Sequence, residues 1–189
     1  MTEPFMMPSV NTPPDGTYFV NTRVEFKDPA KKLILIPMDT RIMSGERTLY
    51  TKQECDADPS IWKTAIENTA QIGLRISPDN DLVSLRSVKK AGTPCAAVLL
   101  LPGKNRRARL MALVSEKLKQ EHMPPAQEHY FMFVTPDEIL LADKSKLKPS
   151  VIRKAMRNIR NRLASTDPGL LLSTEVLEYD TDEDVYREI

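Results

Sequence analysis

The sequence predicts an α+β fold in which about three helices pack on a mostly antiparallel sheet. Three observations lead to this class: apolar runs of strand length, three segments with apolar residues at helical spacing, and the alternation of strands and helices along the chain. The chain has 189 residues, 41% hydrophobic and 28% charged, which is enough apolar content for one core. We expect an extended N-terminal arm over residues 1–16, a single domain over 17–166 and an acidic C-terminal tail over 167–189.

Proline distinguishes the expected arm. The chain has 15 prolines, and four of them, Pro4, Pro8, Pro13 and Pro14, fall within the first fourteen residues. Proline fixes φ and has no backbone N–H, so this stretch suits neither a helix nor a central strand. We therefore expect an extended segment that is available to grip a neighbouring molecule.

Runs of apolar, β-branched and aromatic residues predict the strands. They cover residues 17–26, 32–37, 96–101 and 129–134, with a weaker alternation over 82–88. Residues 136–143 are compatible with two structures. A hairpin with the preceding strand is favoured over a short helix that begins at Thr135, although that helix and the next one would resemble a helix-turn-helix.

Three helices are expected over residues 59–73, 105–121 and 150–165. Asp58 caps the first, and Pro149 opens the last. Helical spacing predicts that the last helix buries one apolar stripe. Its members are Ile152, Ala155, Met156, Ile159 and Leu163.

Charge is the most informative feature of the sequence. The totals balance, with 27 Lys and Arg against 26 Asp and Glu. Along the chain they do not: residues 102–119 carry net +5 (six bases, one acid), residues 140–165 net +7 (eight bases, one acid) and residues 167–189 net −7 (eight acids, one base). Such patterning is typical of proteins that bind charged partners.

The two basic helices supply the candidate nucleic-acid contacts. In the last helix Arg153, Arg157 and Arg160 lie at i, i+4 and i+7 and share one face, because these spacings return to the same side of a helix. Arginine forks onto phosphate oxygens, so such a face suits a nucleic-acid backbone. The full candidate set is Arg153, Lys154, Arg157, Arg160 and Arg162, together with Lys104, Arg106, Arg107 and Arg109 at the start of the preceding helix.

The function favoured by these features is a non-enzymatic, nucleic-acid-associated binding protein that acts within a larger assembly. A structural subunit that grips neighbours with its arm and tail is the alternative. A second alternative is a metal-dependent nuclease, because Asp15, Glu25 and Lys27 match a pattern in which two carboxylates hold Mg²⁺ and a lysine orients water. That pattern requires residues 18–20 and 24–26 to form a hairpin.

Several ligand classes are not indicated. The two cysteines and two histidines lack metal-ligand spacing, and no cofactor motif occurs, so we expect neither a resident metal nor a cofactor. No long apolar run or signal segment is evident, so we expect an intracellular protein without a membrane span. Tyr130, Phe131 and Phe133 suggest an RNA-stacking platform, but core packing is the favoured interpretation.

The acidic tail has two interpretations. One is a last strand followed by a disordered acidic end. The other is a linear motif, acidic with embedded Leu, Val and Tyr, that docks on a basic surface of a partner or on this chain's own helices.

Overall fold

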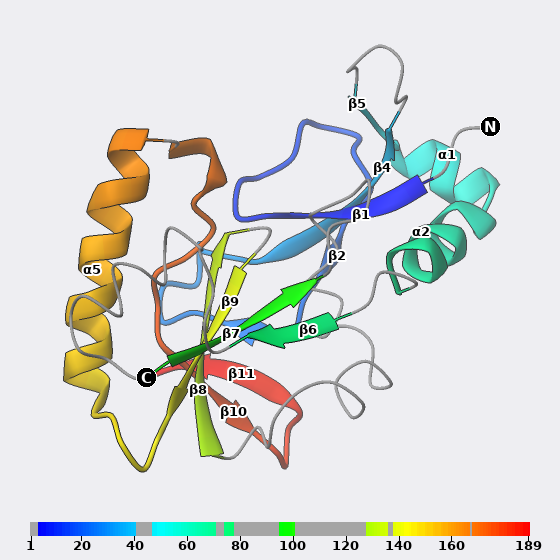
Figure 1. Ribbon diagram of the computed structural model, residues 1–189. Coiled ribbons are helices and arrows are strands. Elements are labelled where there is room, and N and C mark those ends of the chain that lie inside the picture. The colour runs from blue at the N-terminus through cyan, green and yellow to red at the C-terminus, as the bar shows by residue number, and fades with distance from the viewer. Residues whose placement is uncertain are drawn as a thin grey trace.

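Residues 4–40, 47–70, 74–77, 95–100, 128–135, 138–166 and 168–189 are described by the computed structural model of the protein (Figure 1). They form helices and two mostly antiparallel sheets, so the predicted α+β class is confirmed. The strand expected over 82–88 and the helix expected over 105–121 lie outside the described residues. None of the described helices combines the length and the apolar composition that crossing a bilayer requires.

The smaller sheet is centred on β4. Its strands are β1 (Pro4–Ser9), β2 (Val20–Asn21), β4 (Ile34–Thr40) and β5 (Arg47–Leu49). β4 is antiparallel to the other three. The strand expected over 17–26 is divided: the Thr22 backbone N–H and hydroxyl still donate to the carbonyl of Leu33, at 3.1 and 2.8 Å, whereas the Arg23 carbonyl accepts from the Tyr186 N–H at 2.7 Å. Beyond this point the chain leaves the smaller sheet.

The N-terminal residues are extended, as expected, but they are not separate from the domain. β1 pairs along its whole length with β4, and Met6 is 2% exposed. The Asn68 side chain donates to the carbonyl of Pro4 at 3.0 Å. Because β1 ends the described strand order, it is an edge strand, where proline is tolerated. The expected arm therefore supplies part of the core.

The larger sheet has the strand order β3-β11-β10-β8-β9-β7-β6. These strands are β3 (Val24–Glu25), β6 (Leu74–Ser77), β7 (Cys95–Leu100), β8 (His129–Thr135), β9 (Glu138–Asp143), β10 (Leu177–Asp180) and β11 (Val185–Glu188). Its pairings are antiparallel except for β3 with β11. β8 and β9 form the favoured hairpin, so the helix-turn-helix alternative is wrong.

Helices pack at two separate places (Figure 1). α1 (Lys52–Ala57) and α2 (Ser60–Ala70) lie beside the smaller sheet, and α5 (Pro149–Thr166) runs along the other side of the molecule. A capping box between Thr51 and Glu54 begins α1, an element that the sequence did not predict. Asp58 accepts from the Ser60 backbone N–H at 3.0 Å, as expected for the cap of the following helix. The short helix η3 (Pro168–Leu170) follows α5.

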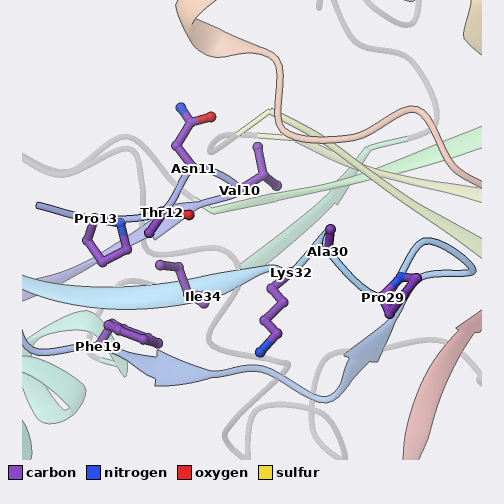
Figure 2. Close-up of a pocket in the computed structure, with 9 residues that line it drawn as sticks. All are labelled: Val10, Asn11, Thr12, Pro13, Phe19, Pro29, Ala30, Lys32 and Ile34. Atoms are coloured by element: carbon purple, nitrogen blue, oxygen red, sulfur yellow. The ribbon is translucent and has the colours of Figure 1, made fainter.

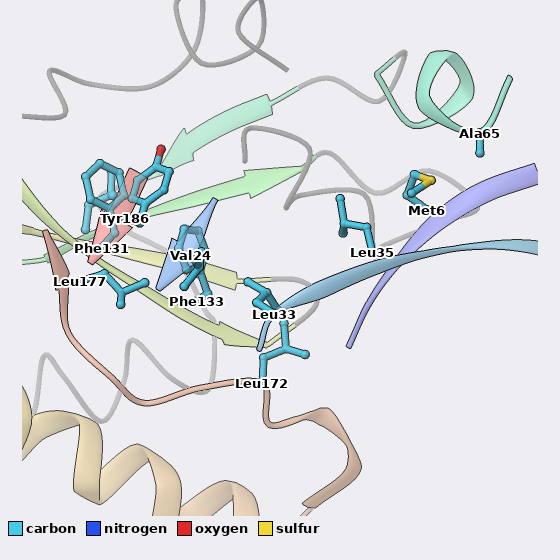
Figure 3. Close-up of a cluster of buried hydrophobic side chains, with 11 residues drawn as sticks. Met6, Val24, Leu33, Leu35, Ala65, Phe131, Phe133, Leu172, Leu177 and Tyr186 are labelled. Atoms are coloured by element: carbon cyan, nitrogen blue, oxygen red, sulfur yellow. The ribbon is translucent and has the colours of Figure 1, made fainter. Parts of the chain in front are cut away.

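Strand β8 of the larger sheet is buried on both faces. Phe131 and Phe133 of β8 meet Leu33 and Leu35 of the smaller sheet in one cluster (Figure 3). Met132 and Val134, which point to the other face, pack with the apolar stripe of α5 in a second cluster. Phe131 and Phe133 are 0% exposed, which confirms core packing for these two rings, and Tyr130 is half-buried against the second cluster with the Lys144 Nζ 5.3 Å from its ring centroid. The sheet therefore carries α5 as a separate outer layer.

The C-terminal residues are also part of this sheet. β10 and β11 form an antiparallel hairpin, and β10 pairs with β8. Tyr186 is 1% exposed, and its ring centroid lies 5.0 Å from that of Phe131 and 5.5 Å from that of Phe133. The expected last strand is present, and the acidic end that follows it is the turn and second strand of the hairpin.

Candidate nucleic-acid interface

The apolar and basic faces of α5 separate as the sequence predicts. The buried residues of the helix are those of the expected stripe, Ile152, Ala155, Met156, Ile159 and Leu163. The candidate bases Arg153, Lys154, Arg157, Arg160 and Arg162 are all exposed. Pro149 fixes φ at the first helical position, where a missing N–H has no cost. The helix contains five bases and no acid, so its outer face carries only positive charge.

Two lysines of the loop before α5 do not belong to this face. Lys146 pairs with Asp143 at 2.9 Å, and Lys144 pairs with Glu178 of β10. The hydrogen bond from Lys146, joined by bonds from Ser145, lowers the pKa of the Asp143 carboxyl, and the same contact raises the pKa of Lys146. The charge of residues 144–146 is thus compensated locally.

The basic residues of α5 differ in their described contacts. Arg153 donates to the backbone carbonyl of Ile189, which leaves other guanidinium N–H groups available. Within the described part of the chain, Lys154, Arg157 and Arg160 form no ion pair with an acid. These three side chains therefore present uncompensated charge to solvent.

The acids of the C-terminal hairpin are paired with bases outside α5. Arg187 of β11 contacts Asp180 and Glu183 of the hairpin, and its Nε lies 3.0 Å from Glu25 of β3. The carboxylates of Glu25 and Glu183, Glu25 first, raise the pKa of Arg187. Hydrogen bonds from the Glu183 and Asp182 backbone N–H groups, together with Arg187, lower the pKa of Asp180. One guanidinium, that of Arg187, thus connects the hairpin to Glu25 of β3.

Further pairs complete the attachment of the acidic residues. Asp184 contacts Arg23, and Glu175 lies 2.9 Å from Lys31, which also lies over the Phe26 ring at 4.7 Å. The tail therefore docks on its own domain, and the described ion pairs that hold it use bases other than those of α5. Among the described ion pairs, none joins an acid of the tail to a basic side chain of α5.

The second group of candidate bases lies outside the described residues. It consists of Lys104, Arg106, Arg107 and Arg109.

The structure does not bring the nuclease candidates together. Asp15 lies in a turn beside the start of α1. A hydrogen bond of 3.1 Å from the Thr17 N–H to the Pro14 carbonyl closes this turn. Gly16 occupies this turn with φ +79°, a conformation that glycine adopts without strain. Glu25 lies in the other sheet and pairs with Arg187. The required hairpin is not formed, because β2 pairs with β4 and β3 with β11.

Lys27, the third residue of the nuclease pattern, lies at the larger sheet. The Lys27 backbone N–H donates to Glu188 at 3.0 Å, which places it at the end of the larger sheet, away from the Asp15 turn. Within the described ranges, no group of three His, Cys, Asp or Glu side chains is arranged to hold a metal ion. This geometry gives the nuclease hypothesis no support.

The subunit hypothesis depended on an arm and a tail that grip neighbours. Both are used inside the domain: β1 pairs with β4, and the β10–β11 hairpin completes the larger sheet. The loop over residues 10–16 is the part of the expected arm that remains outside the strands.

This loop forms one wall of a groove of about 360 Å³ (Figure 2). Phe19, which is 43% exposed, and Ile34 give it an apolar surface, and Lys32 is the one charged residue among its described lining. The remaining lining residues are Val10, Asn11, Thr12, Pro13, Pro29 and Ala30. The described lining includes no carboxylate, imidazole or thiol, and its groups capable of acid–base or nucleophilic chemistry are the Lys32 amine and the Thr12 hydroxyl.

Sequence reasoning missed both the groove and the Arg187 contacts. The groove is made from segments on either side of β2, and no motif marks it. In the sequence, Arg187 is the single basic residue of an acidic tail. That position only weakly indicates a residue that pairs with several carboxylates. The position of α5, in contrast, follows directly from the period of its apolar residues.

Comparison with known proteins adds no further constraint. The chain matches no known family, no curated protein and no solved structure. The geometry and charge of the described residues are therefore the evidence on function.

Proposed function

We propose that the protein is a non-enzymatic nucleic-acid-binding protein that contacts phosphates through the outer face of α5, within a larger assembly. One observation carries this proposal: Lys154, Arg157 and Arg160 remain without an acidic partner in the described structure, although the same chain contains a strongly acidic hairpin. A solvated helix face gains little stability from a run of like charges, because neighbouring like charges at i, i+4 repel.

The rigidity of α5 favours the same proposal. Its opposite face is anchored by five buried side chains, so the bases project from a fixed surface. Arginine on such a surface loses little freedom on binding and donates two parallel hydrogen bonds to phosphate. Binding would release counterions and would therefore weaken as salt rises.

The test is the salt dependence of binding measured by fluorescence anisotropy. The probe is a fluorescein-labelled 30-base-pair DNA of arbitrary sequence, titrated between about 50 and 200 mM KCl. Changing Arg153, Arg157 and Arg160 together to Ala should weaken binding and reduce the slope of log affinity against log salt by about 0.9 for each lost contact. The fold should persist, because these side chains point away from the apolar stripe.

A matched control removes the same charge elsewhere. Lys27, Lys52 and Lys63 are exposed residues outside α5, and changing all three to Ala also removes three positive charges. If this control lowers the salt slope as much as the α5 variant does, affinity depends on the total charge of the protein and not on the face of α5. The proposal is then wrong. It is also wrong if the wild-type protein does not bind the probe at 50 mM KCl.

A further inference from the structure

The exposed side chains of α5 have an order around the helix axis. Each residue of an α-helix advances by about 100°. With Ile152 facing the core at 0°, Asn161 lies at about 180° and Lys154 at about 200°, on the crest opposite the sheet. Ser150 and Arg157 lie within about 40° of the same direction. The crest is therefore polar, with two amide or hydroxyl side chains and two cations.

Basic side chains lie on both flanks of this crest. Arg153 and Arg160 lie at about 100° and 80°, on one flank, and Arg162 lies at about 280°, on the other. Asn158, at about 240°, lies between the crest and the second flank. A cationic flank on each side of a polar ridge is the arrangement that matches a groove with two phosphate walls and a floor of hydrogen-bonding groups.

The major groove of B-form DNA has this shape. It is about 12 Å wide and admits an α-helix, and base edges on its floor present donors and acceptors. From Ser150 to Asn161 the helix rises about 16 Å, which corresponds to roughly five base pairs at 3.4 Å each. α5 forms an outer layer on the larger sheet (Figure 1), and the crest residues Ser150, Lys154, Arg157 and Asn161 are all exposed.

Other nucleic acids fit this face less well. Single strands are held by aromatic side chains that stack on unpaired bases, and α5 has no aromatic residue. The rings of Phe131 and Phe133 are buried. Duplex RNA has a deep and narrow major groove that side chains do not enter.

We infer that α5 inserts into the major groove of double-stranded DNA, an inference that rests on the proposed phosphate-binding function. Asn161 faces the base edges, where an asparagine amide reads adenine through its N6 and N7 atoms. Arg153 and Arg160 contact the phosphates of one strand, and Arg162 faces those of the other. Lys154 and Arg157 lie between the two walls.

The experiment compares four probes of equal phosphate number with the full chain at 100 mM KCl. They are a 20-base-pair DNA duplex, a 40-nucleotide single-stranded DNA, a 20-base-pair RNA duplex, and the DNA duplex with glucosylated 5-hydroxymethylcytosine, whose sugars fill the major groove. We expect the unmodified DNA duplex to bind about tenfold more tightly than each of the other three, the scale of one good base contact.

The outcomes separate this inference from the proposed function. Equal affinity for all four probes would leave phosphate binding intact and overturn insertion into the major groove, as would tighter binding of the single strand or the RNA. Binding to none of them would overturn the proposed function itself.

A variant sharpens the test. Asn161→Ala should remove an adenine preference at one position when bound sequences are selected from a randomised duplex pool, with the salt slope unchanged. A selected pool that is identical for wild type and variant would contradict the base contact.

Discussion

Helix α5 and the β10–β11 hairpin are both highly charged segments, but they differ in whether their charged side chains form ion pairs within the described structure. In the hairpin, Asp180, Glu183 and Asp184 each contact an arginine. On α5, Arg157 and Arg160 have no acidic partner among the described residues. Each segment buries apolar residues on its other face, so burial does not explain the difference.

The comparison shows that net charge along a sequence does not indicate which charges are available. The tail's net −7 and the basic block's net +7 suggest mutual neutralisation. In the structure the described partners of the tail's acids are Arg23, Lys31, Arg187 of the tail itself and, from residues 140–165, Lys144, which precedes α5. Acidic residues that are held elsewhere cannot screen α5 at short range, so its positive field persists.

The largest expected effect comes from the buried side of the hairpin. Tyr186→Ala removes a ring that is 1% exposed and contacts three other aromatic rings. We expect it to lower the free energy of unfolding by about 3–5 kcal/mol. For a chain of this size the melting temperature should fall by roughly 6–20 °C, measured by circular dichroism.

Val151→Ala is the control for this variant, because Val151 lies on α5 and is 45% exposed. It should change the free energy of unfolding by less than about 0.5 kcal/mol. A drop of less than about 2 °C for Tyr186→Ala would mean that the hairpin does not belong to the cooperative core.

The next effect concerns the charged side of the hairpin. Arg187→Ala leaves Glu25, Asp180 and Glu183 close together without their common cation. The melting temperature should fall at 0.05 M salt and recover partly at 1 M salt, because the Debye length shortens to about 3 Å. Arg157→Ala, which removes an equal charge from α5, should show no such loss. Equal behaviour of the two variants would remove the contrast between the segments.

Acid should weaken the hairpin through Asp180. Backbone N–H groups of Glu183 and Asp182, with Arg187, lower the pKa of this carboxyl in the folded protein. A lowered pKa means that its stabilising effect is complete above the ordinary carboxyl pKa of about 4 and is lost as pH falls toward the lower folded value. Asp180→Asn should therefore flatten the decline of melting temperature between about pH 5 and pH 3. An unchanged decline would assign acid sensitivity to other carboxyls, such as Asp143.

The smallest expected effect is on the stability of α5. Changing Lys154, Arg157 and Arg160 to Gln should move the melting temperature by no more than about 2 °C, because exposed substitutions without partners are nearly neutral. Thermal denaturation at low salt measures this shift. A large stabilisation would indicate that repulsion within the helix is costly, and a large loss would show that these bases have a structural role.

Local patterns determined which parts of the fold were predictable. The stripe of α5 and the β8–β9 hairpin follow from periods of 3.6 and 2, which depend only on neighbouring residues. The division of residues 17–26 between two sheets depends on hydrogen bonds with Leu33 and Tyr186, which no local pattern reveals. The burial of Met6 likewise requires β4 and α2 as partners.

The candidate interface was predictable for the same reason. Arg153, Arg157 and Arg160 share a face through helical spacing alone. Whether an acid neutralises them depends on contacts between distant residues, such as Glu25 with Arg187 across 162 positions. Sequence reasoning therefore identified the bases but not the elements that hold the acids away from them.

The parallel pairing of β3 with β11 has a consequence for biosynthesis. Val24 pairs with Tyr186, so β3 receives its neighbour in the larger sheet only after the residues between them have been translated. At about 5–20 residues per second, a separation of 162 positions corresponds to a wait of roughly 8–32 s on the ribosome. In the last part of that interval, after β8 has been translated, Phe131 and Phe133 lack the ring of Tyr186, and contacts between residues so far apart in the sequence slow folding. The larger sheet therefore gains its β3 edge only after β11 has been synthesised.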